Sequence, residues 1–169
     1  MWGVEDVARM PEGQLRPLRH RVQVVFQDPN RSLNPRRTVG QSMVEGAMNF
    51  GQSREQAEAL AVELMAQVRL PVEALKRYPS QFSGGQRQRI AIARAIYGMP
   101  KYVVMDEPNS NLDEVGENAL ISAVKALKDN GGTVIITTHR PRLVSIVDMM
   151  LVLKEGRQVA FGTAKDMLE

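Results

Sequence analysis

The sequence predicts an α/β fold built on a mostly parallel β-sheet, with a block of helices inserted after an early strand. Segments with strand character at residues 21–26, 101–105 and 133–137 alternate with segments whose apolar residues recur at helical spacing. Such alternation is typical of parallel sheets, because consecutive parallel strands need a long crossover connection. The helical pattern between the first two strands is much longer than one crossover requires, which indicates an inserted block.

Composition restricts the classes of protein to which this chain can belong. Its 169 residues suffice for one compact domain, and 43% hydrophobic with 24% charged residues is typical of a globular protein. The absence of cysteine excludes disulfides and thiolate metal sites, and we expect a cytosolic compartment. No apolar run is long enough to span a membrane, and Glu5 and Asp6 interrupt any signal-peptide pattern.

The formal net charge of +3 allows the chain to bind an anionic partner such as a nucleic acid or a membrane surface. A modest excess of arginine is more often a solvated face. Aromatic residues make up only 5% of the chain, which leaves few rings on which bases could stack. We therefore expect no nucleic-acid partner.

The first strand, residues 21–26, reads RVQVVF and is followed by the loop signals of QDPNRSLNP. A helical block then extends from Thr38 to Arg77. Within it Ser53 is a predicted N-cap, and the helix that follows ends before Pro71. The apolar stripe of this helix is predicted to comprise Ala57, Leu60, Ala61, Leu64, Met65 and Val68.

The second half of the chain continues the alternation of helices and strands. A helix that follows PSQFSGG places Ile90, Ala93 and Tyr97 on one face. The next helix, EVGENALISAVKALKD, ends at a glycine pair where a C-cap is expected. Strands at residues 149–153 and 157–161 complete the pattern, and we expect the apolar strands to be buried on both faces of the sheet.

Two adjacent carboxylates, Asp106 and Glu107, follow the apolar segment YVVM. An acid at a strand end often does no more than cap the next helix. Open α/β sheets, however, bind ligands at the carboxyl ends of their strands. There, one carboxylate could hold a magnesium ion while the next acts as a base, and this pair of residues alone does not decide between the two interpretations.

The segment FSGGQ, residues 82–86, is a second candidate site. Ser83 lies where an N-cap belongs, and Gly84 and Gly85 open the helix without side chains. Several amide N–H groups and the positive end of the helix dipole would then face one point, which favours a phosphate. For SGG alone, an ordinary serine N-cap is the alternative, which the following QRQRIAIARA makes weaker.

These segments together resemble the motifs of ABC-type ATPases, in that family's order. FSGGQRQRIAIARA is similar to the signature motif, and VVFQD resembles the Q-loop, with Gln27. YVVMDE resembles the Walker B strand, SNLD the D-loop ending at Asp113, and IITTH the switch strand ending at His139. The resemblance covers nearly the whole chain from Arg21 onward.

The resemblance implies a P-loop NTPase-like sheet with an inserted helical subdomain. Residues 1–37 would form the strand and Q-loop part of the ATPase core, and residues 38–99 the helical subdomain with the signature motif. Residues 100–169 would form the core with Walker B, D-loop and switch histidine.

The resemblance also implies ATP as ligand, Mg²⁺ as cofactor and a role for each motif residue. Asp106 would hold Mg²⁺, and Glu107 would orient and deprotonate the water that attacks the γ-phosphate. Gln27 would touch the metal and that water from a mobile loop. His139 would hydrogen-bond the γ-phosphate, although a histidine at a strand end is by itself more often without a function.

In this family the signature motif binds the nucleotide held by a second subunit. Ser83, Gly84, Gly85 and Gln86 would therefore contact nucleotide across a head-to-tail dimer, in which Asp113 makes a dimer contact. The other implied partner is a transmembrane permease. The chain would lie peripherally at the cytoplasmic face of the cell membrane.

One part of the family pattern is missing from this sequence. No GxxxxGK[ST] loop is present, and no lysine follows a glycine. We therefore expect the chain to be the second, larger part of an ATPase domain, without its amino-terminal Walker A part, and to be inactive by itself.

The resemblance itself divides near Ile96. The segments before it look like the ATPase subunits of peptide importers, whereas IYGMPKYVVMDEPNSNLDEVGENAL and THRPRLVSIVD resemble protease-secretion exporters of type I. These transporters move substrate in opposite directions, so import and export both stay open, as does a chimeric origin.

Two alternatives to a transporter ATPase remain. The chain could be a truncated or chimeric fragment that folds without catalysing hydrolysis. It could also be an ABC ATPase that acts on DNA. Those proteins carry long coiled coils or zinc modules between the motifs, whereas the insertion from Thr38 to Arg77 is short and lacks sustained heptads and cysteines.

Overall fold

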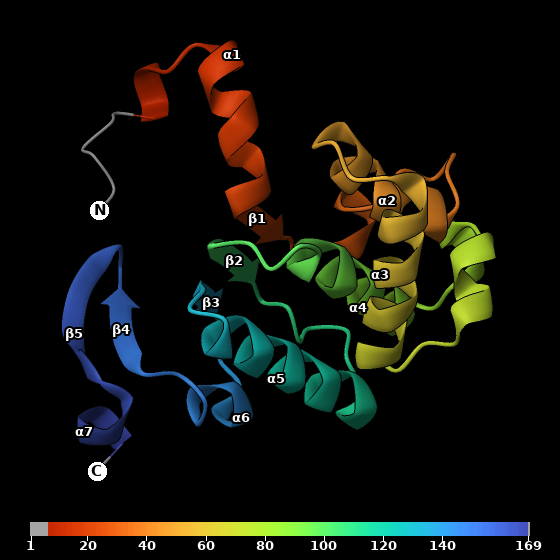
Figure 1. Ribbon diagram of the computed structural model, residues 1–169. Coiled ribbons are helices and arrows are strands. Elements are labelled where there is room, and N and C mark those ends of the chain that lie inside the picture. Colours follow the sequence, from red (N-terminus) through yellow and green to blue (C-terminus); the bar gives the residue numbers. More distant parts are fainter. Residues whose placement is uncertain (1–6, 169) are drawn as a thin grey trace. The chain divides into compact units, whose positions relative to one another are not determined.

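A computed structural model describes residues 7–168 of the chain (Figure 1). The chain divides into two compact units, the first ending at Thr137 and the second beginning at Thr138. Within the described residues, no helix combines the length and apolarity that crossing a bilayer requires.

The first unit is built on a three-stranded parallel sheet with the order β1-β2-β3. Its strands are β1 (Val22–Val25), β2 (Tyr102–Asp106) and β3 (Thr133–Thr137). All three were predicted, and the α/β fold class with a parallel sheet is confirmed. Because Val25 pairs with Met105 and Asp106 with Thr137, the carboxyl ends of the strands lie at one edge of the sheet.

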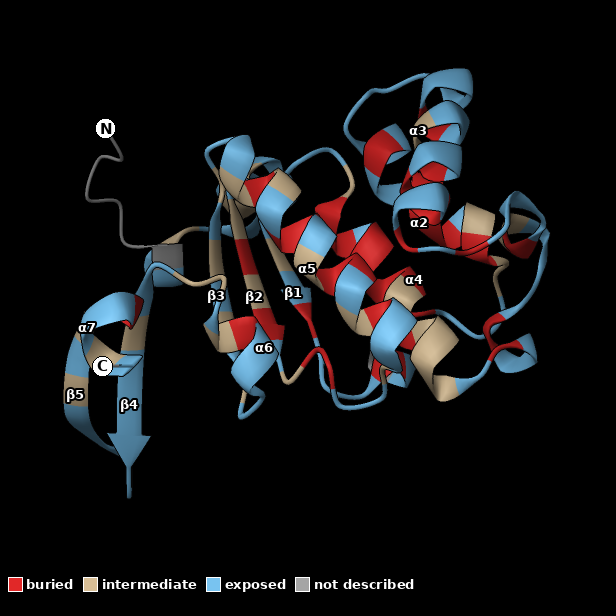
Figure 2. Cartoon of the chain, turned by 90° about the horizontal axis from the view of Figure 1, so that it is seen from below, coloured by how far each residue is buried: buried red, intermediate tan, exposed pale blue. Residues whose placement is uncertain are grey.

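Two helices cover one face of this sheet, α4 (Gly84–Ile96) and α5 (Glu114–Asp129) (Figure 2). Val25, Val103 and Met105 alternate along their strands toward this face and are buried. The prediction of burial on both faces was wrong for the described residues. Val24 and Ile135 point to the other face and are 43% and 56% exposed, because both helices pack on the same side.

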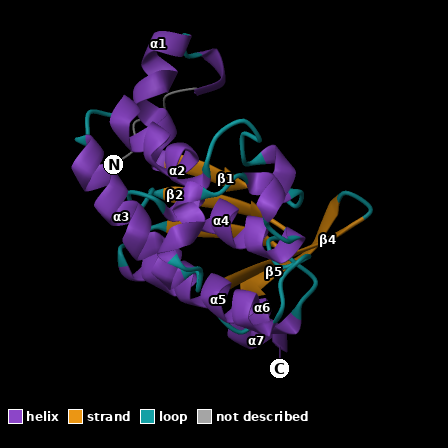
Figure 3. Ribbon diagram, turned by 90° about the vertical axis from the view of Figure 1, so that its right-hand side faces the viewer, coloured by secondary structure: helices purple, strands orange, loops and turns teal. Residues whose placement is uncertain are grey.

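The inserted block begins with α2 (Val39–Asn49) and α3 (Arg54–Gln67), which pack together beside α4 (Figure 3). Thr38 and the predicted N-cap Ser53 each form a capping box with the glutamine three residues later. The predicted stripe of α3 is buried except for Leu60, which is partly exposed. Two short 3-10 helices, η4 (Val72–Lys76) and η5 (Pro79–Gln81), connect α3 to α4.

A helical stretch that the sequence did not predict precedes β1. It consists of η1 (Val7–Arg9), α1 (Glu12–Leu15) and η2 (Arg16–Arg21). Pro11 and Pro17 stand at or next to the first positions of α1 and η2, where a missing N–H costs no hydrogen bond.

The second unit contains α6 (Pro141–Val144), the strands β4 (Met149–Lys154) and β5 (Arg157–Thr163), and α7 (Ala164–Leu168). Both strands were predicted, and they pair as an antiparallel hairpin. Glu155 and Gly156 form its two-residue turn at φ of 50° and 74°. Positive φ at both central residues matches the right-handed twist of a hairpin.

Candidate functional site

The carboxyl edge of the sheet brings Asp106, Glu107 and Thr137 together. The Thr137 hydroxyl donates a hydrogen bond of 2.6 Å to Asp106 Oδ1. The Glu107 N–H in turn donates to the carbonyl oxygen and to the hydroxyl of Thr137, both at 3.1 Å. Thr137 therefore holds the side chain that ends β2 and the backbone that follows it. Thr137 was not predicted to be a site residue, although its place at the end of a predicted strand was a usable signal.

Glu107 has a left-handed backbone conformation, with φ at +41°. Residues other than glycine rarely adopt this region of φ and ψ, and such a conformation persists only where the surrounding structure enforces it. The two hydrogen bonds that the Glu107 N–H donates to Thr137 provide that constraint, and the Glu107 carbonyl also accepts from the Ser110 N–H at 3.1 Å. The chain therefore leaves the direction of β2 immediately after Asp106.

Gln27 reaches Glu107 from the loop that follows β1. Its Nε2 donates a hydrogen bond of 3.0 Å to Glu107 Oε2. The loop turns directly afterwards, because the Asp28 side chain accepts from the Asn30 N–H and caps η3 (Pro29–Arg31). Three residues that the sequence analysis placed in the catalytic and metal site, Gln27, Asp106 and Glu107, thus lie at one edge of the sheet.

The start of α4 lies against the loop after β2. Ser83 caps the helix, and its hydroxyl accepts from the Gln86 N–H while the Gln86 side chain accepts from the Ser83 N–H. A Cβ built on Gly85 would lie 2.6 Å from the Asn111 carbonyl oxygen, so only glycine permits this approach. Close packing against Asn111 therefore requires glycine at position 85, in addition to any role of its amide N–H in binding phosphate.

A hollow of about 340 Å³ lies where these loops meet. It is lined by Gln27, Asp28, Gly84, Arg87, Ser110 and Asn111, among others. The loops after β1 and β2 and the first turn of α4 thus share one concave surface within the first unit.

Two further predicted site residues are Asp113 and His139. Asp113 caps α5, since its Oδ1 accepts from the Gly116 N–H at 2.8 Å. Its predicted dimer contact stays a prediction. His139 is an exposed residue at the start of the second unit, two positions after Thr137, and its contact with phosphate also stays a prediction.

The side chains at the sheet edge suit magnesium. Residues 7–168 hold no cluster of three histidine, cysteine or acidic side chains that could bind a metal by themselves. Mg²⁺ is usually held by one or two carboxylates together with water and substrate phosphates. The Asp106 carboxylate and the Gln27 amide oxygen are hard ligands of this kind.

Comparisons with known proteins indicate the family of this chain. A family model described as "ABC transporter" matches residues 4–110. A protein of Brucella ovis named as a peptide import ATP-binding protein is 37% identical over 171 residues, which cover 99% of this chain and 54% of that protein. The type I secretion system ATP-binding protein PrsD of Rhizobium meliloti is 52% identical over 86 residues, 51% of this chain and 15% of that protein.

A solved structure shares the fold. The dimeric ATP-binding cassette MJ0796, bound to ADP and Pi, superposes with a TM-score of 0.82 at 25% identity. The superposition covers 92% of this chain and 68% of the cassette. The chain spans about half the length of the Brucella ovis protein and a smaller part of PrsD.

Proposed function

Because the chain belongs to the ABC transporter family, we propose that it is part of the ATP-binding and ATP-hydrolysing component of a peptide importer. The observation that supports this most strongly is the convergence of Gln27, Asp106 and Glu107 at the carboxyl edge of the sheet. Open α/β sheets bind their ligands there. ATP is the proposed ligand, and hydrolysis of its γ-phosphate is the proposed reaction.

The share of the chain that each kind of relative matches favours import over export. Similarity to the peptide-import protein covers 99% of this chain, whereas similarity to the secretion ATPase covers 51%. The higher identity to the secretion ATPase, 52%, is confined to that shorter stretch. We therefore propose that the transported substrates are peptides and that they are imported into the cell.

In the proposed mechanism Glu107 is the general base. Its Oε2 is held by Gln27 and its backbone by Thr137, so the carboxylate is oriented before substrate binds. It would accept a proton from the water that attacks the γ-phosphate, and a positioned base contributes about 10² to 10⁴-fold to a rate. Charge on the phosphate oxygens would be neutralised by Mg²⁺ held by Asp106 and Gln27.

The remaining motif residues act between two copies of the chain in this proposal. Ser83, Gly84, Gly85 and Gln86 offer the amides at the start of α4 to a nucleotide bound by a second subunit. Asp113 contacts that subunit, and His139 hydrogen-bonds the γ-phosphate. The functional parts remain those proposed from the sequence, residues 1–37, 38–99 and 100–169.

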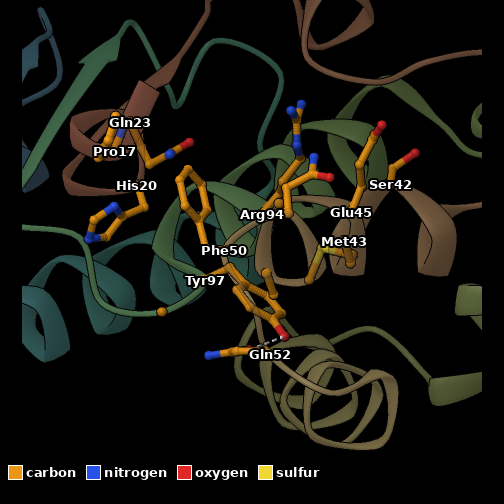
Figure 4. A pocket seen from close by; sticks show the side chains of 14 residues that line it. Pro17, His20, Gln23, Ser42, Met43, Glu45, Phe50, Gln52, Arg94 and Tyr97 are labelled. Carbon is orange, nitrogen blue, oxygen red and sulfur yellow. Dashed lines mark hydrogen bonds between the residues drawn. The ribbon is translucent and has the colours of Figure 1, made fainter. Parts of the chain in front are cut away.

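A docking site for the permease is proposed at the inserted block. A cavity of about 530 Å³ lies between η2, α2 and the end of α4 (Figure 4). The rings of His20 and Phe50, 5.0 Å apart, line it together with Met43 and Arg94. Tyr97 also lines it, and its hydroxyl donates to the Ala57 carbonyl at 3.0 Å. A permease segment in this cavity would hold the chain at the cytoplasmic face of the membrane.

ATP binding and turnover test the proposed function. The 169 residues contain no GxxxxGK[ST] loop, so the measurement uses the chain extended at its amino terminus by a strand–GxxxxGK[ST]–helix segment. The extended chain should bind Mg-ATP in titration calorimetry and release phosphate. If it folds with a native circular dichroism spectrum and binds no nucleotide, the non-catalytic alternative is correct.

A further inference from the structure

Gln88 is a fully buried amide in the middle of α4. Its side chain is 0% exposed, and its Oε1 has no hydrogen-bond partner among residues 7–168. A buried acceptor without a partner lowers stability, whereas an apolar side chain of the same shape would not. Packing alone therefore gives no reason for an amide at this position.

This amide donates a hydrogen bond to the backbone of the loop after β1. Gln88 Nε2 donates to the Phe26 carbonyl at 3.4 Å, a long bond. Phe26 directly precedes Gln27, whose side chain donates to Glu107. Gln88 thus holds the peptide unit from which the loop and Gln27 begin.

The same helix also holds the other end of this loop. The Arg94 guanidinium donates to the Ser32 carbonyl, and Ser32 follows η3 directly. The segment from Phe26 to Ser32 is therefore attached to α4 at both ends, while its Gln27 side chain reaches the proposed base between these two points.

We propose that Gln88 is a positioning residue, which holds Gln27 in hydrogen-bonding register with Glu107. A helix moves as a rigid element, so a displacement of α4 at its Ser83 end would carry the Phe26 carbonyl with it. Gln27 would then leave or approach Glu107 Oε2. The meaning of this link for hydrolysis rests on the proposed function, whereas the link itself is testable without any turnover.

The test is made on the full 169-residue chain by NMR. Gln88→Met keeps the side-chain volume and removes the donor, and Ile90→Met is the control at another fully buried position of α4. In Gln88→Met the side-chain amide signal of Gln27 should move toward its position in Glu107→Ala, where the acceptor is gone. Backbone amides of residues 26–28 should exchange about fivefold faster, the factor expected for one hydrogen bond.

The control should leave both signals unchanged, because it removes no contact with the loop. A folded Gln88→Met chain with the Gln27 signal and the exchange rates of the unchanged chain would overturn the proposal. If the substitutions act only by repacking the core, the Gln27 signal and the exchange rates should change equally in both variants. That result would also overturn the proposal.

A second measurement leaves Gln88 in place, in case its replacement prevents folding. In Gln27→Ala the loop loses its bond to Glu107, so its attachment to α4 should loosen. The side-chain amide protons of Gln88 should then exchange several-fold faster than in the unchanged chain. Equal exchange in the two chains would show that Gln88 and Gln27 are not linked.

Discussion

Replacing Thr137 by valine tests how the two acids are held. Valine keeps the β-branched shape that suits a strand, and removes only the hydroxyl. That hydroxyl donates to Asp106 Oδ1 at 2.6 Å and accepts from the Glu107 N–H at 3.1 Å. The Glu107 N–H keeps the Thr137 carbonyl as a partner, so the main loss is the bond to the carboxylate.

The size of the effect follows from this bond. A hydrogen bond to a charged group contributes about 1.5 to 3 kcal/mol to stability, but Asp106 and Thr137 are exposed, and solvent reduces this value. We therefore expect Thr137→Val to lower the free energy of unfolding by about 1 kcal/mol.

Thr133→Val is the matched control for this change. Thr133 begins the same strand and is also exposed, and within the described part of the chain its hydroxyl has no hydrogen bond that the change would remove. Urea unfolding followed by circular dichroism measures both variants. If Thr137→Val lies within about 0.5 kcal/mol of the control, the range of ordinary surface changes, the hydroxyl does not hold the acids and the reasoning is refuted.

Three further predictions concern the missing phosphate loop, Glu107 and Gly85. The 169-residue chain alone should show no ATP turnover above background, because it lacks the phosphate loop, and steady-state phosphate release by the pure chain would contradict this. In the extended chain, Glu107→Gln should bind ATP with little change in affinity and lose about 10²-fold or more in kcat, and a near-normal kcat would remove Glu107 as the base. Gly85→Ala should destabilise the fold by about 1 to 3 kcal/mol, since its Cβ would lie 2.6 Å from Asn111 O. Gly84→Ala, whose nearest contact is 3.9 Å away, should cost little, and equal unfolding midpoints for the two would count against this packing.

Local sequence patterns predicted most of the secondary structure. The N-caps at Ser53 and Ser83 were predicted because a short polar side chain precedes each apolar helical stripe, and both form capping boxes. The strand over residues 133–137 was predicted to the residue, because its apolar run is bounded by a glycine pair and a polar segment. These features depend on residues that are close together in the sequence, so the local sequence pattern is enough to predict them.

Contacts between segments that are far apart in the sequence could not be predicted from it. The bond from Thr137 to Asp106 depends on the register of β2 against β3, and the bond from Gln88 to Phe26 depends on how α4 packs over β1. Burial on both faces of the sheet was wrong for the same reason, since strand hydrophobicity does not say which side the helices cover. The helical stretch before β1 was missed because its prolines and mixed charges give no apolar periodicity.

The cross-dimer role of Ser83 is the central claim, and it is tested most directly by mixing two variants of the extended chain that are each expected to be inactive. Ser83→Arg places a bulky side chain at the start of α4, and Glu107→Gln removes the base. In a mixed dimer of the proposed head-to-tail kind, the intact Glu107 of one subunit would face the intact Ser83 of the other, so one of the two sites would be whole. Phosphate release should therefore return on mixing, while Ser83→Arg alone still binds ATP as a monomer. Mixed dimers that form, as light scattering would report, yet hydrolyse no more ATP than either parent would contradict the assignment, as would loss of ATP binding by the Ser83→Arg monomer.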